Sequence, residues 1–185
     1  MIEKGSFGSD FKGELEVNRG INEHALIYSI WDTELIRDGK CIDTSRSHNR
    51  CVDQGLNHIL NVQFHGAAQI DPWYILIFED DYTPLAADTY QVPGFTESIA
   101  YTEAARQAFV ESEATAKSLT NSANKAVFSI NAAKNIYGGA LVSLVTINDQ
   151  TAGNFMYCAA NFGEGKSVES GDTFKVTVTL SASDL

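Results

Sequence analysis

Apolar and polar residues are arranged in short runs over the last third of the chain. The runs are rich in Val, Ile, Thr and aromatic residues, glycine or asparagine separates them, and they cover residues 126–130, 139–147, 154–162 and 173–180. Runs of this composition and spacing are typical of strands in a β-sandwich or β-barrel. The pattern therefore predicts a mainly β protein, a β-sandwich of the jelly-roll or Ig-like kind.

Further strands are predicted earlier in the chain. Residues 25–36 alternate imperfectly, and the continuous apolar run 73–78 has the length of a strand that is buried on both faces. Asp38 and Gly39 join two runs and favour a two-residue type I′ turn, because both turn positions need φ > 0. This pair predicts a β-hairpin over residues 34–43. Residues 96–101 and 104–112 are also interpreted as strands, although 103–110 has helix propensity.

One helix is predicted within the β pattern, over residues 52–64. Apolar side chains recur there at helical spacing, at Val52, Leu56, Ile59, Leu60 and Phe64. Asn49 is placed to cap the helix, and Asp53 in the first turn suits the helix dipole. Gly66 is expected to end the helix, and residues 118–125 are expected to form a polar turn before the final strands.

The second faces of the predicted sheets need a cover. Runs 73–78 and 139–147 carry apolar residues at both odd and even positions, and hence on both faces of a strand. One sandwich core covers only one face of each sheet. The predicted helix is about 20 Å long, enough to shield part of one sheet. Because large exposed apolar patches are rare on monomers, we expect a neighbouring chain to cover the remainder, and hence self-association.

The length of 185 residues fits one domain. Residues 1–24 are polar and interrupted by four glycines, so we expect an extended N-terminal arm there, followed by a single β-sandwich domain over residues 25–185. The start of the chain lacks the apolar centre of a signal peptide, and no run approaches the roughly 18 apolar residues of a membrane span. We therefore expect neither feature.

The charge balance excludes one class of partner. The chain has 24 acidic and 13 basic residues and a net charge of −11. Nucleic-acid binding depends on clusters of Lys and Arg, which are absent here, so no nucleic-acid partner is expected. Cys41, Cys51 and Cys158 lack the paired spacing of a metal site and are expected to be reduced thiols in a protein made in the cytoplasm.

The candidate chemistry is sparse. His58 and His65, with Asp53 or Asp71, have the side chains for a metal site, but we interpret them as parts of an amphipathic helix and its C-terminal end. The acidic run 79–81 lacks the pattern of a calcium loop and is interpreted as a solvated turn.

Two further motifs of an active site are also lacking. Residues 163–167 lack the spacing of a phosphate loop and are interpreted as a hairpin or crossover loop. No serine lies in a Gly-x-Ser-x-Gly elbow. We therefore expect no enzyme activity, no catalytic residue, no cofactor and no metal.

The aromatic residues allow two interpretations. Trp31, Trp73, Tyr74, Phe78 and Phe128 are numerous enough for a carbohydrate- or peptide-binding platform. In a β-sandwich, however, aromatic side chains supply much of the buried area. We expect these residues to form the core.

The order of several segments resembles small structural proteins of tailed bacteriophages that are encoded near the major capsid protein. The resemblance covers residues 34–182 and includes Gly55-Leu-Asn-His-Ile-Leu60 and Ser170-Gly-Asp-Thr-Phe-Lys-Val-Thr-Val-Thr-Leu180. It is a pattern over the chain rather than a functional motif, and it carries over no catalytic residue. The resemblance implies a part of the virion and does not distinguish head from tail.

The resemblance, the β-rich body and the acidic charge lead to one functional expectation. We expect a capsid decoration, or cement, protein that binds the major capsid protein on the outer lattice of the virion and is made in the host cytoplasm. The polar arm could order on that lattice. The alternatives are a tail, adaptor or head-fibre component, and a receptor- or glycan-binding module of the virion.

Overall fold

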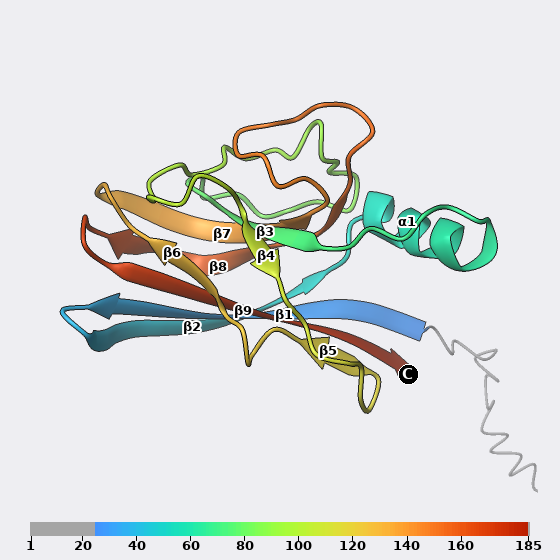
Figure 1. The fold of residues 1–185 in the computed structure, drawn as a ribbon, viewed down its shortest axis with the longest axis horizontal. Helices are drawn as coiled ribbons and strands as arrows, with labels where there is room; N and C mark the ends of the chain where they lie inside the picture. Colours follow the sequence, from blue (N-terminus) through green and yellow to red (C-terminus); the bar gives the residue numbers. More distant parts are fainter. Residues whose placement is uncertain (1–24, 185) are drawn as a thin grey trace, which may run out of the picture.

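Two antiparallel sheets pack face to face in the computed structural model, which describes residues 25–184 (Figure 1). The strands are β1 (Ala25–Arg37), β2 (Lys40–Arg50), β3 (Trp73–Phe78), β4 (Gln107–Phe109), β5 (Ser118–Thr120), β6 (Ala126–Ser129), β7 (Lys134–Val142), β8 (Met156–Val168) and β9 (Thr173–Asp184). The helix is α1 (Asp53–Phe64). The mainly β sandwich is confirmed. The predicted arm, residues 1–24, lies outside the described residues.

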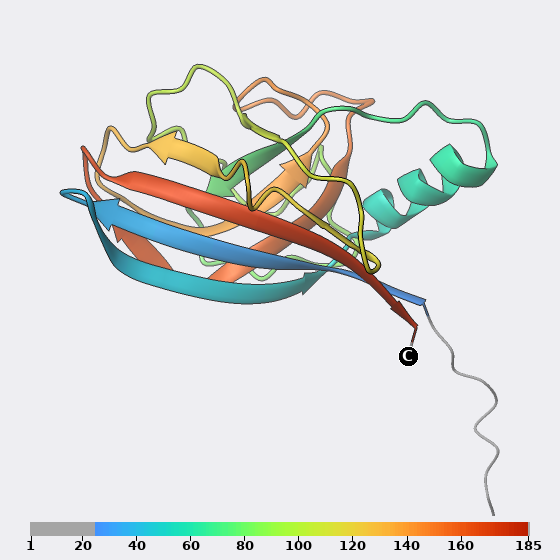
Figure 2. The same ribbon diagram turned by 60° about the horizontal axis from the view of Figure 1, so that its bottom comes forward.

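The first sheet has the order β2-β1-β9-β5, and β6 also pairs with β9. Figure 2 shows its three long strands, β1, β2 and β9, running side by side. The second sheet has the order β4-β3-β7-β8. Ala25 at the start of β1 is paired with Asp184 at the end of β9, so the two ends of the described chain meet at one end of the sandwich.

The β1–β2 hairpin is confirmed and is longer than predicted. Asp38 has φ 50° and Gly39 has φ 72°, as a type I′ turn requires. β2 continues through the polar residues 44–50, because each pairs with a residue of β1, from Glu34↔Thr44 to Tyr28↔Arg50. The polar composition hid this half of the strand.

The main core lies between the sheets. In β1 the odd positions Ser29, Trp31, Thr33 and Leu35 are buried, and the Trp31 indole donates to Ser29 Oγ at 2.9 Å. The largest fully buried aromatic side chains of this cluster are Trp31, Phe128 and Phe174. The alternation that looked imperfect in the sequence is therefore regular with respect to this core.

β3 is buried on both faces, as predicted. Ile75 and Ile77 belong to the main core, whereas Leu76 and Phe78 belong to a second cluster on the outer face of the second sheet. The ring of Phe95 stacks on Phe78 with centroids 4.2 Å apart. The connection between β3 and β4 folds back over this face of β3, where the sequence led us to expect α1 or a neighbouring chain. Self-association stays a prediction.

The strand boundaries in the second half differ from prediction in several places. β8 continues to Val168, so residues 163–167 lie within a strand and the predicted loop was wrong. Ser167 and Lys166 pair with Asn135 and Ile136 of β7, and a register shift separates these pairs from Asn161. β7 begins at Lys134 and ends at Val142, earlier than the predicted 139–147. Residues 118–125 include β5, and only 107–109 of the predicted strand 104–112 pair as a strand. Residues 96–101 contribute isolated bridges from Glu97 and Tyr101.

The long edge strands of the two sheets lie beside each other. Cys51, directly after β2, forms an antiparallel bridge with Cys158 in β8, and Lys166 of β8 pairs with Asp43 of β2 at 3.1 Å. β2 and β8 therefore close one side of the sandwich.

Helix α1 is confirmed, but its start is not capped as predicted. Asn49 lies in β2 opposite Ser29, and Val52 is the N-cap residue without a side-chain cap. Carbonyl oxygens outside the helix accept from the backbone N–H groups at its start instead: Val52 N donates to Tyr157 O at 3.1 Å and Asp53 N to Ala86 O at 2.8 Å.

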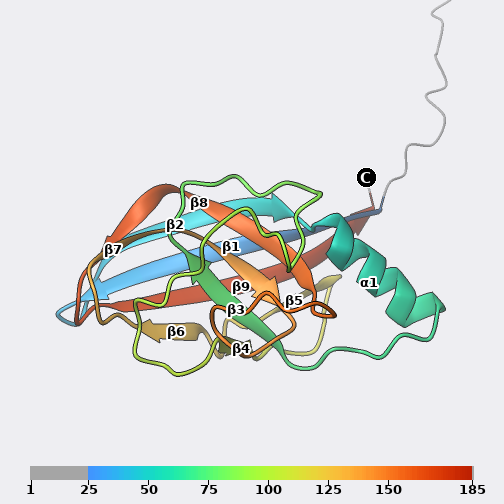
Figure 3. The same cartoon turned by 90° about the horizontal axis from the view of Figure 1, so that it is seen from above.

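The first turn of α1 is pressed against β8, and the rest of the helix projects from one end of the sandwich (Figures 1 and 3). A Cβ at Gly55 would lie 2.3 Å from the Tyr157 carbonyl oxygen, so this close contact needs glycine. Gly66 with φ 72° follows the helix end as predicted. The contact at Gly55 fixes which face of α1 meets the core.

Candidate protein-binding surface

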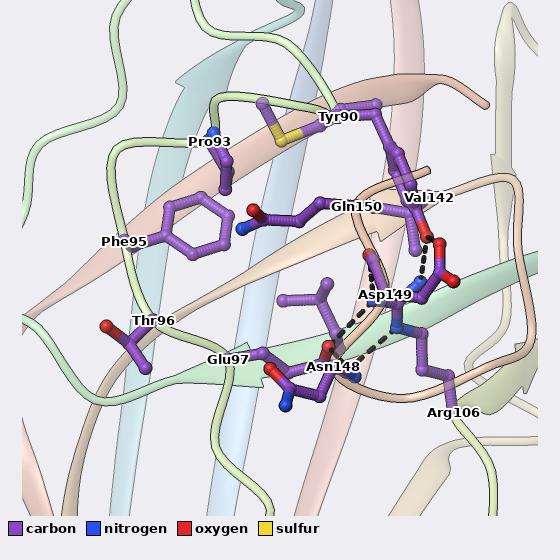
Figure 4. A pocket seen from close by; sticks show the side chains of 12 residues that line it. Tyr90, Pro93, Phe95, Thr96, Glu97, Arg106, Val142, Asn148, Asp149 and Gln150 are labelled. Atoms are coloured by element: carbon purple, nitrogen blue, oxygen red, sulfur yellow. Dashed lines mark hydrogen bonds and ion pairs between the residues drawn. The ribbon is translucent and has the colours of Figure 1, made fainter. Parts of the chain in front are cut away.

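A small cavity of about 120 Å³ lies on the outer face of the second sheet, beneath the connection that covers β3 (Figure 4). Arg106 donates from Nε and Nη2 to the Glu97 carboxylate at 2.8 and 2.7 Å. Its Nη1 donates to Tyr90 Oη at 2.8 Å and to Leu144 O at 2.9 Å, and Nη2 also donates to Asp149 O at 3.2 Å. Every N–H of the guanidinium therefore has a partner within the chain.

The Arg106–Glu97 pair acts as a clamp rather than a ligand site. Both side chains are buried, with 2% and 7% exposure, and Glu97 also accepts from Asn148 N at 2.7 Å. Burial works to lower the pKa of Arg106, but the bonds to Glu97 outweigh it and keep that pKa above its ordinary value. The clamp ties the β3–β4 connection to the β7–β8 connection over the second sheet. No local pattern in the sequence signals it, because its partners are brought together only by the fold.

The two histidines considered for a metal site do not converge. His58 is buried between Trp73 and Phe155, with ring centroids 5.7 and 4.6 Å away, and burial lowers its pKa. His65 is exposed and follows the end of α1 as its C-cap residue. Within residues 25–184 no group of three His, Cys, Asp or Glu side chains is arranged to hold a metal ion.

The three carboxylates of the acidic run after β3 each contact a different residue of the chain. Glu79 pairs with Lys134 at 2.8 Å, Asp80 accepts from Thr96 N, and Asp81 accepts from Asn161 at 3.3 Å. The carboxylates are engaged by the chain itself.

Chelation is expected to leave stability unchanged. Because Glu79, Asp80 and Asp81 each have a protein partner, removal of cations should not alter the free energy of unfolding. The measurement is the melting curve of the purified protein with and without EDTA. A fall in Tm of several degrees on addition of EDTA would contradict this interpretation and indicate that residues 79–81 bind a cation.

The aromatic residues serve the core, as predicted for most of them. Trp31, Phe78 and Phe128 have no exposed surface, which excludes them from a binding platform. Trp73 and Tyr74 are half-buried at the start of β3. Trp73 packs edge-on against Tyr157 with centroids 5.6 Å apart.

The end of the sandwich from which α1 projects is incompletely covered. Most of the half-buried apolar residues packed against the main core lie at this end: Ile27, Leu56, Ile59, Trp73, Leu119 and Leu180. Ile59, Trp73, Leu119 and Leu180 line a groove of about 530 Å³ between α1 and the sheets. Figure 3 shows α1 standing beside this end of both sheets. The main core thus reaches the surface under the helix.

The distal half of α1 adds two exposed apolar side chains beside the groove. Leu60 is 55% exposed and Phe64 79% exposed, and they lie one helical turn apart. The sequence pattern placed Val52, Leu56, Ile59, Leu60 and Phe64 on one apolar face. The Gly55 contact turns Leu56 and Ile59 toward the core and leaves Leu60 and Phe64 in solvent.

We call Leu60, Phe64 and the groove residues Ile59, Trp73, Leu119 and Leu180 the α1 surface. It joins projecting apolar side chains to a partly open core, and it offers area to bury rather than chemistry to perform. Contiguous exposed apolar patches of this kind are typical of interaction surfaces.

No protein family model matches the chain, and no curated protein matches it. The resemblance to bacteriophage structural proteins therefore stays a prediction. Within residues 25–184, α1 is the one α-helix, and it is too short and polar to cross a membrane.

Proposed function

We propose that this chain is a bacteriophage capsid decoration protein that binds the major capsid protein on the outer lattice and stabilises the shell. The observation that carries the proposal is the α1 surface, where exposed apolar side chains of α1 lie beside a partly open core at one end of the sandwich. The resemblance supplies the virion context. The proposal involves no catalysis and no cofactor.

The charge distribution supports an outer location. The net charge is −11, which disfavours contact with packaged DNA. Many cations of the described residues are already paired with carboxylates: Arg37 with Asp172, Arg46 with Asp32, Lys125 with Glu34, Lys134 with Glu79 and Lys166 with Asp43. Such pairs leave little positive charge to attract phosphate.

The mechanism is the burial of area at joints between capsid subunits. Each copy would seat Phe64 and Leu60 against the lattice and cover the groove beside them. Removal of apolar surface from water contributes about 25 cal/mol per Å² before the costs of association. Because each copy contributes separately, the stabilisation would grow with occupancy. Self-association through the same surface is the second expected contact.

The double substitution Leu60→Ser with Phe64→Ser is expected to abolish attachment while leaving the fold intact. Both side chains are largely exposed, so the Tm should change by no more than a few degrees. Shells that lack the protein are mixed with each variant, sedimented and analysed on a stained gel. The matched control, Val92→Ser, changes a side chain that is 71% exposed elsewhere and should bind normally.

Salt distinguishes this proposal from an electrostatic one. Apolar burial is not screened, so raising the salt to about 1 M, where the Debye length is about 3 Å, should leave bound protein on the shell. Release by salt alone, or equal binding of the double variant and the Val92→Ser control, would reject the α1 surface.

A tail, adaptor or head-fibre role would use the same kind of apolar contact. Copy number separates the two: a decoration protein should approach the copy number of the major capsid protein, and a tail or fibre component should be far scarcer. The band intensities of purified virions on a stained gel decide between them. The receptor- or glycan-binding alternative would depend on Trp73 and Tyr74, which are half-buried, because Trp31, Phe78 and Phe128 are fully buried.

A further inference from the structure

Cys51 and Cys158 face each other where the two sheets meet. Cys51 directly follows β2 and Cys158 lies in β8, and the two residues form an antiparallel bridge. Val52 N donates to Tyr157 O at 3.1 Å, the hydrogen bond that flanks a non-hydrogen-bonded pair. In such pairs the Cα atoms are about 4.5 Å apart, and disulfides span about 4.4–6.8 Å between Cα atoms. The backbone therefore already has the spacing that a disulfide needs.

The two thiols differ in access and in acidity. Both are free and buried, with 4% and 0% exposure, but Cys51 lines a groove at the base of α1, whereas Cys158 lies behind it. The hydrogen bond with Cys158 lowers the pKa of Cys51. Burial raises the pKa of Cys158. Cys51 is therefore the thiol that a small reagent can reach and that ionises first.

We propose that Cys51 and Cys158 form a cross-strand disulfide when the protein meets a small-molecule disulfide such as oxidised glutathione. The bond would join the end of β2 to β8 and so link the two sheets covalently. The site is independent of any partner, and it goes beyond the proposed role on the capsid.

The exchange has two steps. The Cys51 thiolate attacks one sulfur of oxidised glutathione, whose S–S bond breaks and releases one glutathione thiolate. The Cys158 thiol then passes its proton to that thiolate, and its sulfur attacks the Cys51 sulfur of the mixed disulfide and releases the second glutathione. Two protein thiols are oxidised to one disulfide, and one glutathione disulfide is reduced to two thiols.

The disulfide would close a loop that contains α1 and the strands β3 to β7. A bond across a loop of this length constrains the unfolded chain strongly. For a chain of this size we expect oxidation to raise the Tm by roughly 10 °C. Reduction with dithiothreitol should reverse the shift.

Cys41 provides an internal reference. It is exposed and lies near the hairpin turn, opposite Ile36, at the other end of β2 from Cys51. Because it is exposed, Cys41 can form a mixed disulfide with glutathione or link two chains, and the Cys41→Ser variant removes both reactions. This variant should form the internal disulfide as readily as the unaltered chain.

The test treats the purified full chain with oxidised glutathione, blocks the remaining thiols under denaturing conditions and measures the intact mass and the linked peptides. In Cys41→Ser we expect no blocked thiol and a Cys51–Cys158 peptide. In Cys158→Ser the mixed disulfide should accumulate on Cys51, because the second thiol is gone. In Cys51→Ser no glutathione should reach Cys158.

The same treatment has outcomes that overturn the proposal. Two blocked thiols in oxidised Cys41→Ser, a linked dimer in place of the internal bond, or an unchanged Tm after complete oxidation would each reject it. The mass and Tm of Cys41→Ser are measured with both buried cysteines in place. The result therefore stands even if a substitution at Cys51 or Cys158 prevents folding.

Discussion

Replacement of Ile75 by Asp is expected to abolish folding. Ile75 has no exposed surface and lies in the central part of the second sheet, paired with Leu141 of β7 and Gln107 of β4. The substitution removes about 1.5–3 kcal/mol of side-chain burial and adds an unpaired carboxylate to an apolar core. Domains are stable by only about 5–15 kcal/mol, so the unfolded state should dominate.

The measurement is far-UV circular dichroism together with the soluble yield. Ile99→Asp is the matched control, because Ile99 is 58% exposed and the same change there should leave a cooperative melting curve. A soluble Ile75→Asp protein with a cooperative transition would show that β3 is not a central strand.

The second large effect is expected from Arg106→Met. The substitution leaves the Glu97 carboxylate buried without its cation, and loss of one partner of a buried pair costs about 3–5 kcal/mol. Urea unfolding, followed by tryptophan fluorescence, should show a lower midpoint. Arg46→Met serves as the control: Arg46 is 65% exposed in its pair with Asp32, and such surface pairs contribute about 0–1 kcal/mol.

A double variant separates lost charge from lost packing. Glu97→Gln combined with Arg106→Met removes the uncompensated charge while keeping similar volume, so it should be more stable than Arg106→Met alone. The clamp does not act through the buried pair if the double variant is less stable than Arg106→Met. The same conclusion follows if Arg46→Met lowers the free energy of unfolding as much as Arg106→Met does.

The elements with local signals were predictable from the sequence. Asp38-Gly39 specifies its turn through backbone conformation alone, and the run Trp73–Phe78 is apolar at every position. Helix α1 followed from the spacing of its apolar residues. In each case the chain carries the determinant within a few residues.

The parts that prediction missed depend on distant partners. Residues 44–50 and 166–167 have turn-like compositions, yet they are paired in strands because β1 and β7 supply backbone partners. Asn49 has the chemistry of a cap, but pairing with Ser29 holds it in β2. The segment that covers the second sheet looks like an ordinary loop until Phe95 stacks on Phe78.

The candidate surface was predictable in part. Helical spacing identified the apolar residues of α1 but not their division between core and solvent, which the contact of Gly55 with Tyr157 decides. The groove needed the fold as well, since Trp73, Leu119 and Leu180 come from three strands.

The position of the chain ends has a practical consequence for peptide display. Ala25 and Asp184 meet at the end from which α1 projects, whereas the Asp38–Gly39 turn lies at the opposite end of the long hairpin (Figure 1). In the proposed orientation, a tag fused after Leu185 would crowd the docking end. A foreign epitope inserted between Asp38 and Gly39 would instead face away from the shell, where a tolerant loop tip can present it in many copies.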